Sequence, residues 1–159
     1  MKSRFVVSFG LASLISFCAL AGDYDASLAE GYAKLFAPVA GAAAGKGLHC
    51  MPPEKFIKEL QAGKRFVPLD VRTQNEAGIY GVTLPGSLSI PVNEVFLPEN
   101  LARIPQDETV LVVCKSGIRA AAVATALRHI GFSDVYILKG GLMALAKYLD
   151  PKVANPSRK

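Results

Sequence analysis

The stretch TVLVVCKSGIR, residues 109–119, is the strongest indication of the fold class in this sequence. Its first half, Thr109 to Val113, is β-branched and aliphatic throughout, which is typical of a strand buried on both faces of a parallel sheet. The alanine-rich residues 120–130 that follow predict a helix, and Gly131 ends it. A buried strand, a short loop and a helix in succession favour an α/β domain, in which such loops commonly bind ligands.

The same alternation continues on both sides of this stretch. A helix is expected from Pro52-Pro53-Glu54 to about Gln61. Phe66 to Val71 is expected to form a strand, in which Pro68 requires an edge or an early position. Further elements are predicted as a short helix after the capping box at 73–76, a strand at 87–90, a broken helix at 93–104, a strand at 135–138 and a last helix at 142–149. The sheet is therefore expected to be mainly parallel.

The amino-terminal residues have the layout of a signal peptide. Lys2 and Arg4 precede an apolar run, and Ala19-Leu20-Ala21 predicts cleavage before Gly22. The run has about 17 residues, shorter than the roughly 20 of a membrane-anchoring helix, which is the alternative. Removing residues 1–21 lowers the formal charge from +5 to +3. We therefore expect an exported protein, in the bacterial periplasm, with neither nucleic acid nor membrane as a partner.

An Ala/Gly-rich extension, residues 22–50, should precede a domain at 51–150 and a tail at 151–159. Apolar residues at helical spacing between Leu28 and Val39 predict a short amphipathic helix. Such a helix either packs on the domain's own surface or binds a partner protein. Residues 40–47 are expected to form a flexible tether after it.

Cys114 lies where the buried strand meets the helix. The N–H groups of the loop and the positive end of the helix favour a thiolate at this position. Gly117 allows the loop to curl tightly, and Arg119 adds a positive fork suited to oxyanions. These residues predict a nucleophilic cysteine in an anion-binding loop. The alternative is an inert cysteine at the end of a buried strand.

Four motifs together resemble rhodanese-like domains over residues 51–150. They are Asp70-Val71-Arg72, Leu84-Pro85-Gly86-Ser87 before Ile90-Pro91, the Cys-x-x-Gly-x-Arg loop at 114–119, and Leu138-Lys139-Gly140-Gly141. The resemblance implies a three-layer α/β sandwich of about five mainly parallel strands with helices on both faces. It also implies transfer of sulfane sulfur, through a Cys114 persulfide, from thiosulfate or a persulfide donor to a thiol, to cyanide or to a protein acceptor.

The resemblance also assigns the site residues. It implies that the sulfur donor is bound by Lys115, Ser116, Gly117, Ile118 and Arg119. Asp70 and Arg72 are expected to support the site, and neither a metal nor a cofactor is implied. The loop from Cys114 to Arg119 has six residues, as in sulfurtransferase members, whereas the related phosphatases and arsenate reductases have one more. The sequence departs from the family at Val82-Thr83-Leu84, where a Gly-His pair is common, and at Ala120, where serine is frequent.

Two other functions stay open at this point. A sulfur carrier or binding module would need the same persulfide without efficient turnover of thiosulfate. A redox protein would pair Cys50 with Cys114. Cys50 is otherwise expected to pack under the first domain helix as a small apolar residue. We expect His129, at the end of its helix, and His49, beside Cys50, to play no part in catalysis.

Overall fold

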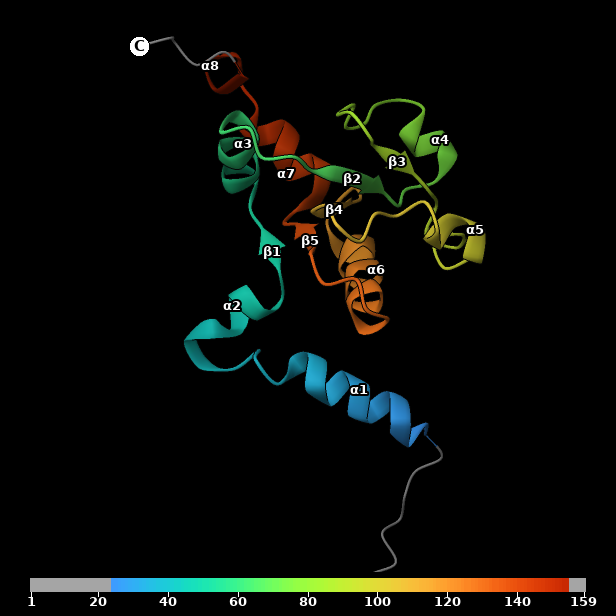
Figure 1. The fold of residues 1–159 in the computed structure, drawn as a ribbon. Helices are drawn as coiled ribbons and strands as arrows, with labels where there is room; N and C mark the ends of the chain where they lie inside the picture. The colour runs from blue at the N-terminus through green and yellow to red at the C-terminus, as the bar shows by residue number, and fades with distance from the viewer. Residues whose placement is uncertain (1–23, 155–159) are drawn as a thin grey trace, which may run out of the picture.

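The fold is built on one parallel sheet. The computed structural model describes residues 24–154. Its five strands have the order β1-β5-β4-β2-β3, and every neighbouring pair is parallel (Figure 1). The strands are β1 (Cys50–Met51), β2 (Val67–Asp70), β3 (Leu88–Ser89), β4 (Val110–Val113) and β5 (Val135–Leu138).

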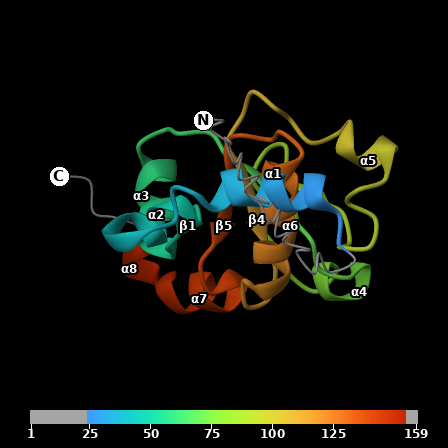
Figure 2. The same cartoon turned by 90° about the horizontal axis from the view of Figure 1, so that it is seen from below.

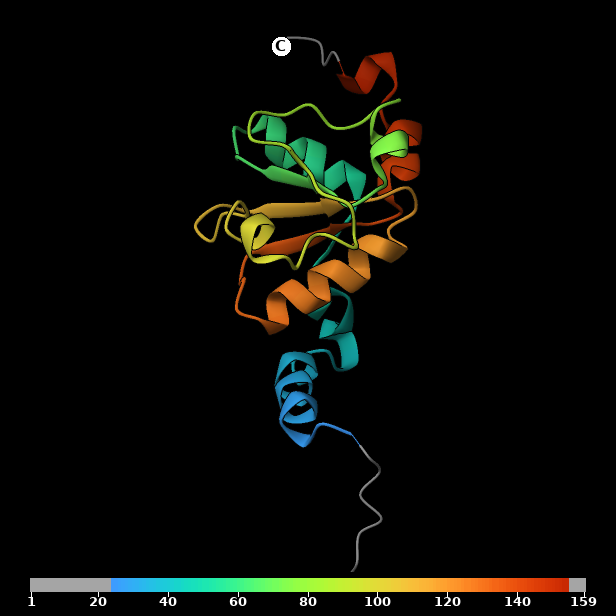
Figure 3. The ribbon, with the colours of Figure 1, turned by 90° about the vertical axis from the view of Figure 1, so that its right-hand side faces the viewer.

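Helices cover both faces of this sheet, as the α/β three-layer prediction requires. The helical segments are α1 (Ala26–Phe36), η1 (Gly41–Ala43), α2 (Ala44–Gly47), α3 (Pro53–Gln61), α4 (Gln74–Ala77), α5 (Pro98–Leu101), α6 (Ile118–His129), α7 (Gly141–Tyr148) and α8 (Pro151–Ala154). Figure 3 shows the sheet edge-on, with α3 and α7 on one side and α6 on the other. The predicted fold class is therefore confirmed.

Strand β4 joins the two halves of the core because its side chains alternate between the two faces of the sheet. Val110 and Val112 pack in the cluster that includes the buried face of α6. Leu111 and Val113 pack in the cluster formed with α3 and α7. All four are at most 1% exposed, which explains why this run is apolar without alternation.

Pro68 lies in an interior strand, so the edge-strand alternative is wrong and the early position is correct. The backbone N–H of Val67 donates to the Thr109 carbonyl on the β4 side, at 2.9 Å. The backbone nitrogen of the next residue, Pro68, therefore points away from β4 and toward the β3 side. On that side β3 pairs only from Leu69 onward. The missing N–H of Pro68 consequently removes no ladder hydrogen bond.

The helix expected over residues 93–104 is reduced to the single turn α5 (Pro98–Leu101). Leu97, before Pro98, is extended, because the proline ring disfavours helical backbone in the preceding residue. The amide of Asn100 donates to the Glu94 carbonyl at 2.9 Å and ties the preceding turn to α5. A hydrogen-bonded turn thus replaces the first half of the predicted helix.

The tether expected at residues 40–47 is also wrong, because the chain there forms η1 and α2. Strand β1, which the sequence did not indicate, begins three residues after the end of α2. The backbone N–H of Ile137 donates to the His49 carbonyl, and the backbone N–H of Lys139 donates to the Met51 carbonyl, both at 2.9 Å. These bonds attach β1 to the edge of the sheet beside β5.

Helix α1 lies outside α6, as the view from below shows (Figure 2). The Tyr32 ring stacks on the His129 ring with centroids 3.9 Å apart. Gly31 permits this approach, because an added Cβ would collide with the His129 imidazole. This arrangement agrees with a helix packed on the domain's own surface. Among residues 24–154, no helix is long and apolar enough to cross a membrane, and the expected signal peptide lies outside these residues.

Candidate active site

Cys114 lies between the carboxyl end of β4 and the first turn of α6. Its side chain belongs to the buried core and the residue is 1% exposed. Sγ accepts hydrogen bonds from the backbone N–H groups of Gly117, at 3.1 Å, and Ala120, at 3.4 Å. These donors and the positive end of the helix stabilise a negatively charged sulfur. The geometry therefore suits a thiolate nucleophile.

The amino terminus of α7 is hydrogen-bonded to the Cys114 loop, residues 114–119. The N–H of Leu142 donates to the Cys114 carbonyl at 2.9 Å, and the N–H of Met143 donates to the Lys115 carbonyl at 3.1 Å. Gly141 has a φ of +61°, and a Cβ on it would collide with both carbonyl oxygens. The glycine pair at 140–141 thus allows close contact between two backbone segments. Gly117, with a φ of +94°, is the N-cap residue that directly precedes α6.

Asp70 and Arg72 form a buried ion pair beside this loop. Arg72 is 1% exposed, and its Nε donates to Asp70 Oδ1 at 2.9 Å. These hydrogen bonds raise the pKa of Arg72 above its usual value. The same guanidinium donates to the carbonyls of Glu76, at 3.2 Å, and Tyr80. The pair therefore fixes the segment from residue 72 to residue 80.

Arg119 reaches from the Cys114 loop to the same segment. Its guanidinium forms a two-pronged ion pair with the Glu76 carboxylate, with both N–O distances at 2.7 Å. The hydrogen bond from Arg119 lowers the pKa of Glu76 to about 2. The sequence indicated Glu76 only as part of the capping box with Thr73, which the structure confirms. Its ion pair with Arg119 was missed, because nothing local links residues 43 positions apart.

The remaining predicted residues lie around the mouth of the loop. Lys115, Ser116 and Ile118 are exposed, and Gly117 is half-buried. Lys115 lines an open pocket together with Arg72, Glu76, Ile79 and Tyr80. All these residues follow the carboxyl ends of β2 and β4, where α/β sheets bind ligands.

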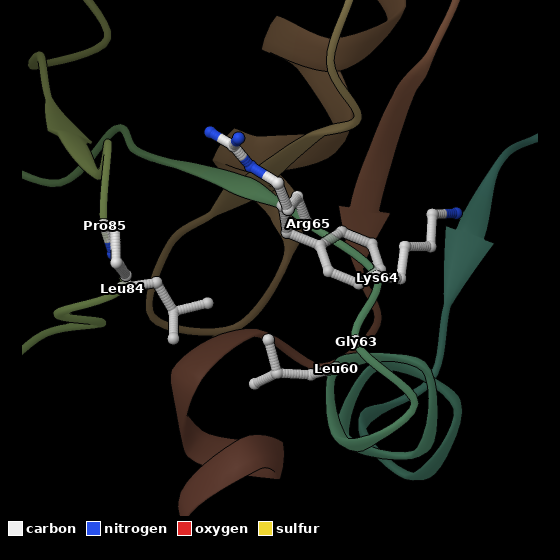
Figure 4. Close-up of a pocket in the computed structure, with 7 residues that line it drawn as sticks. Leu60, Gly63, Lys64, Arg65, Leu84 and Pro85 are labelled. Atoms are coloured by element: carbon white, nitrogen blue, oxygen red, sulfur yellow. The ribbon is translucent and has the colours of Figure 1, made fainter.

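Another pocket lies at the opposite end of the sheet. It is lined by Leu60, Gly63, Lys64, Arg65, Phe66, Leu84 and Pro85 (Figure 4). Lys64, Arg65 and Phe66 precede β2, whereas Cys114 follows β4. Because the two strands are parallel, this pocket lies a strand length away from Cys114. It is not part of the site.

Cys50 is exposed, so the expectation that it packs under the first domain helix is wrong. It pairs with Ile137 in β5, which pairs with Val112 in β4. Cys114 is thus two strands across and two residues further along, a separation of roughly 12 Å between Cα atoms. Disulfides need Cα atoms within about 7 Å, so this fold does not bring the two thiols together. His49 stacks on Tyr136 instead of facing the site.

The described residues hold no cluster of three or more His, Cys, Asp and Glu side chains suited to a metal ion.

Comparison with known proteins identifies the family. The model of the rhodanese-like domain matches residues 53–148. The chain is 36% identical over 110 residues to the probable adenylyltransferase/sulfurtransferase MoeZ of Mycobacterium tuberculosis, covering 69% of this chain and 27% of that protein. It is 33% identical over 86 residues to a sulfurtransferase of Allochromatium vinosum, covering 54% of this chain and 77% of that protein.

Solved structures agree with these matches. A rhodanese-like domain protein from Staphylococcus aureus superposes with a TM-score of 0.53 at 27% identity, over 60% of this chain and 89% of that one. The chain spans only about a quarter of the length of MoeZ, so the activity of that whole protein is not assigned to it. Because the family model matches residues 53–148 and the relatives include sulfurtransferases, the chain belongs to the rhodanese-like sulfurtransferase family.

Proposed function

We propose that this protein moves sulfane sulfur through a persulfide on Cys114, from thiosulfate or a persulfide donor to a thiol or to cyanide. The observation that carries the proposal is the pair of N–H donors, from Gly117 and Ala120, directed at Cys114 Sγ. A sulfur held in this way is stabilised as an anion and needs no general base. The same loop offers N–H groups to the outer sulfur of a persulfide.

In the first step the Cys114 thiolate attacks the outer sulfur of thiosulfate. A bond forms between Sγ and that sulfur, while the S–S bond of thiosulfate breaks and sulfite leaves with its electron pair. In the second step the acceptor attacks the outer sulfur of the persulfide. The bond to Sγ breaks, its electron pair returns to Cys114, and the thiolate is restored.

Lys115 and Arg119 have different roles in this proposal. Lys115 is exposed and makes no ion pair among residues 24–154, so it is free to attract the anionic donor. Arg119 is a third exposed, and its fork is held by Glu76. We propose that its charge stabilises anions at the loop while its pairing holds the loop in shape.

A steady-state assay with thiosulfate and cyanide tests the proposal. The wild type should form thiocyanate with kinetics in which sulfite leaves before cyanide reacts, and Cys114→Ser should be inactive. A serine hydroxyl has nearly the same size but neither ionises nor holds the sulfur. Appreciable turnover by the serine variant would contradict the proposal. A wild type that loads sulfur but turns over only slowly would favour the carrier function.

We also propose export of the protein, with cleavage between Ala21 and Gly22. The proposal is supported by the positive start, the apolar run and the small residues before the predicted cleavage point. Amino-terminal sequencing of the protein from the periplasmic fraction should begin at Gly22. A membrane-bound chain that retains residues 5–20 would favour the anchoring helix instead.

A further inference from the structure

Large apolar side chains are left exposed around the Cys114 loop. Ile79 and Ile118, which are 82% and 78% exposed, are the two most exposed large apolar side chains in the described part of the chain. Met143 and Tyr80 are 55% and 51% exposed. A soluble domain exposes single apolar residues widely, but a group of them beside a nucleophile indicates a binding surface.

These four residues, which we call the apolar rim, are each linked to Lys115 or to its loop. Ile79 and Tyr80 line one pocket with it. The backbone N–H of Met143 donates to the Lys115 carbonyl at 3.1 Å. Ile118 is three residues further on and begins α6. The rim residues thus come from three separate segments of the chain that all adjoin the Cys114 loop.

The chemistry of the rim differs from the chemistry that thiosulfate and cyanide require. A small anion needs the N–H groups and a positive charge, and it is too small to cover four apolar side chains. The charges add a second requirement. Glu76 is neutralised by Arg119, whereas Lys115 has no ion-pair partner in the described residues. A complementary ligand is therefore apolar and carries a carboxylate.

We propose that the apolar rim binds a cysteine-bearing segment of an acceptor protein, in which apolar side chains flank the cysteine and a carboxylate faces Lys115. This inference rests on the proposed sulfur transfer and names its acceptor. The partner's thiolate attacks the protonated outer sulfur of the Cys114 persulfide. A new S–S bond forms, the bond to Sγ breaks with its electron pair, and the proton stays on the transferred sulfur. The products are the Cys114 thiolate and a persulfide on the partner.

The test uses the full chain and separates loading from discharge. Thiosulfate loads the protein, and intact-mass measurement counts the gain of one sulfur atom. Three synthetic peptides of equal length then discharge it, each with one cysteine: the first has flanking leucines and a glutamate, the second has serines in place of the leucines, and the third has lysine in place of the glutamate. The rate of discharge is measured under single-turnover conditions.

The leucine–glutamate peptide should discharge the persulfide about tenfold faster than either of the others, since each loses one kind of contact. Ile79→Ser and Met143→Ser should load fully, react normally with cyanide and lose most of the preference for leucine. Ile130→Ser is the matched control, because Ile130 is 52% exposed but lies beyond the far end of α6, and this variant should behave as wild type.

Two results would overturn the inference in distinguishable ways. If the protein loads sulfur and all three peptides react at the same rate, or if the preference survives in both rim variants, the rim does not bind the acceptor. If thiosulfate adds no sulfur to the protein at all, the proposed function fails and this inference fails with it.

Discussion

Replacing Gly141 by alanine tests whether the contact between α7 and the Cys114 loop shapes the site. A Cβ at this position would lie 2.5 Å from the Lys115 carbonyl oxygen and would also collide with that of Cys114. Both obstacles are backbone atoms, so no side-chain rotation relieves the clash. The same two carbonyls accept the hydrogen bonds from Leu142 and Met143. The substitution must therefore move the loop, the helix or both.

The size of the effect follows from comparison with Gly63→Ala. Gly63 also has a positive φ, of +88°, but nothing lies within 4 Å of a Cβ there. Its replacement should lower the free energy of unfolding only by the conformational cost, about 1–2 kcal/mol. Gly141→Ala adds overpacking of about 1–3 kcal/mol, which gives a total of about 2–5 kcal/mol.

Urea unfolding of both variants and of the wild type measures these differences, and the thiosulfate–cyanide assay measures the effect on the site. Gly63→Ala should keep wild-type activity. Gly141→Ala should lose at least about tenfold in turnover, because a displacement near 1 Å at a reacting centre is enough for such a loss. If Gly141→Ala were as stable as Gly63→Ala and fully active, the contact between α7 and the loop would not matter.

Three further predictions concern the charges and thiols near the site. Arg119 lowers the pKa of Glu76 to about 2, so the loss of stability in Glu76→Gln relative to the wild type should be constant above pH about 5. This difference should shrink as the pH falls toward 2, and urea unfolding midpoints across this pH range measure it. Lys115→Ala should mainly raise the KM for thiosulfate, whereas Arg119→Ala should also lower kcat; equal, small effects would contradict the separate roles. Cys50→Ala should keep full activity, and peptide mapping without reductant should find no Cys50–Cys114 disulfide, since the two strands hold these residues apart.

The central elements of the fold were predictable because local signals agree with tertiary structure there. The apolar run of β4 is buried on both faces, and the predicted limits of β5 match the structure. Sequence reasoning failed where distant partners decide the structure. Strand β1 is only two residues long and exists through its pairing with β5. Pro68 lies in an interior strand because β3 starts late, which no local pattern reveals.

In the candidate site, too, the features that depend on local motifs were predictable, whereas those that depend on distant partners were not. The motif around Cys114 predicted a nucleophilic cysteine beside the start of a helix, and the structure places the thiol there with two N–H groups directed at its sulfur. The ion pair between Glu76 and Arg119 needs the fold to bring α4 beside α6. One signal for it was present: Glu76 stands in a capping box directly after the Asp70-Val71-Arg72 motif, so its helix had to start near the carboxyl end of β2.

Peptide mass spectrometry of the protein after incubation with thiosulfate and rapid alkylation tests directly whether Cys114 carries the transferred sulfur. A persulfide on Cys114 predicts one added sulfur atom on the peptide that contains Cys114, none on the peptide that contains Cys50, and loss of the added sulfur on treatment with cyanide. Added sulfur on Cys50 alone, or none on Cys114 at saturating thiosulfate, would contradict it.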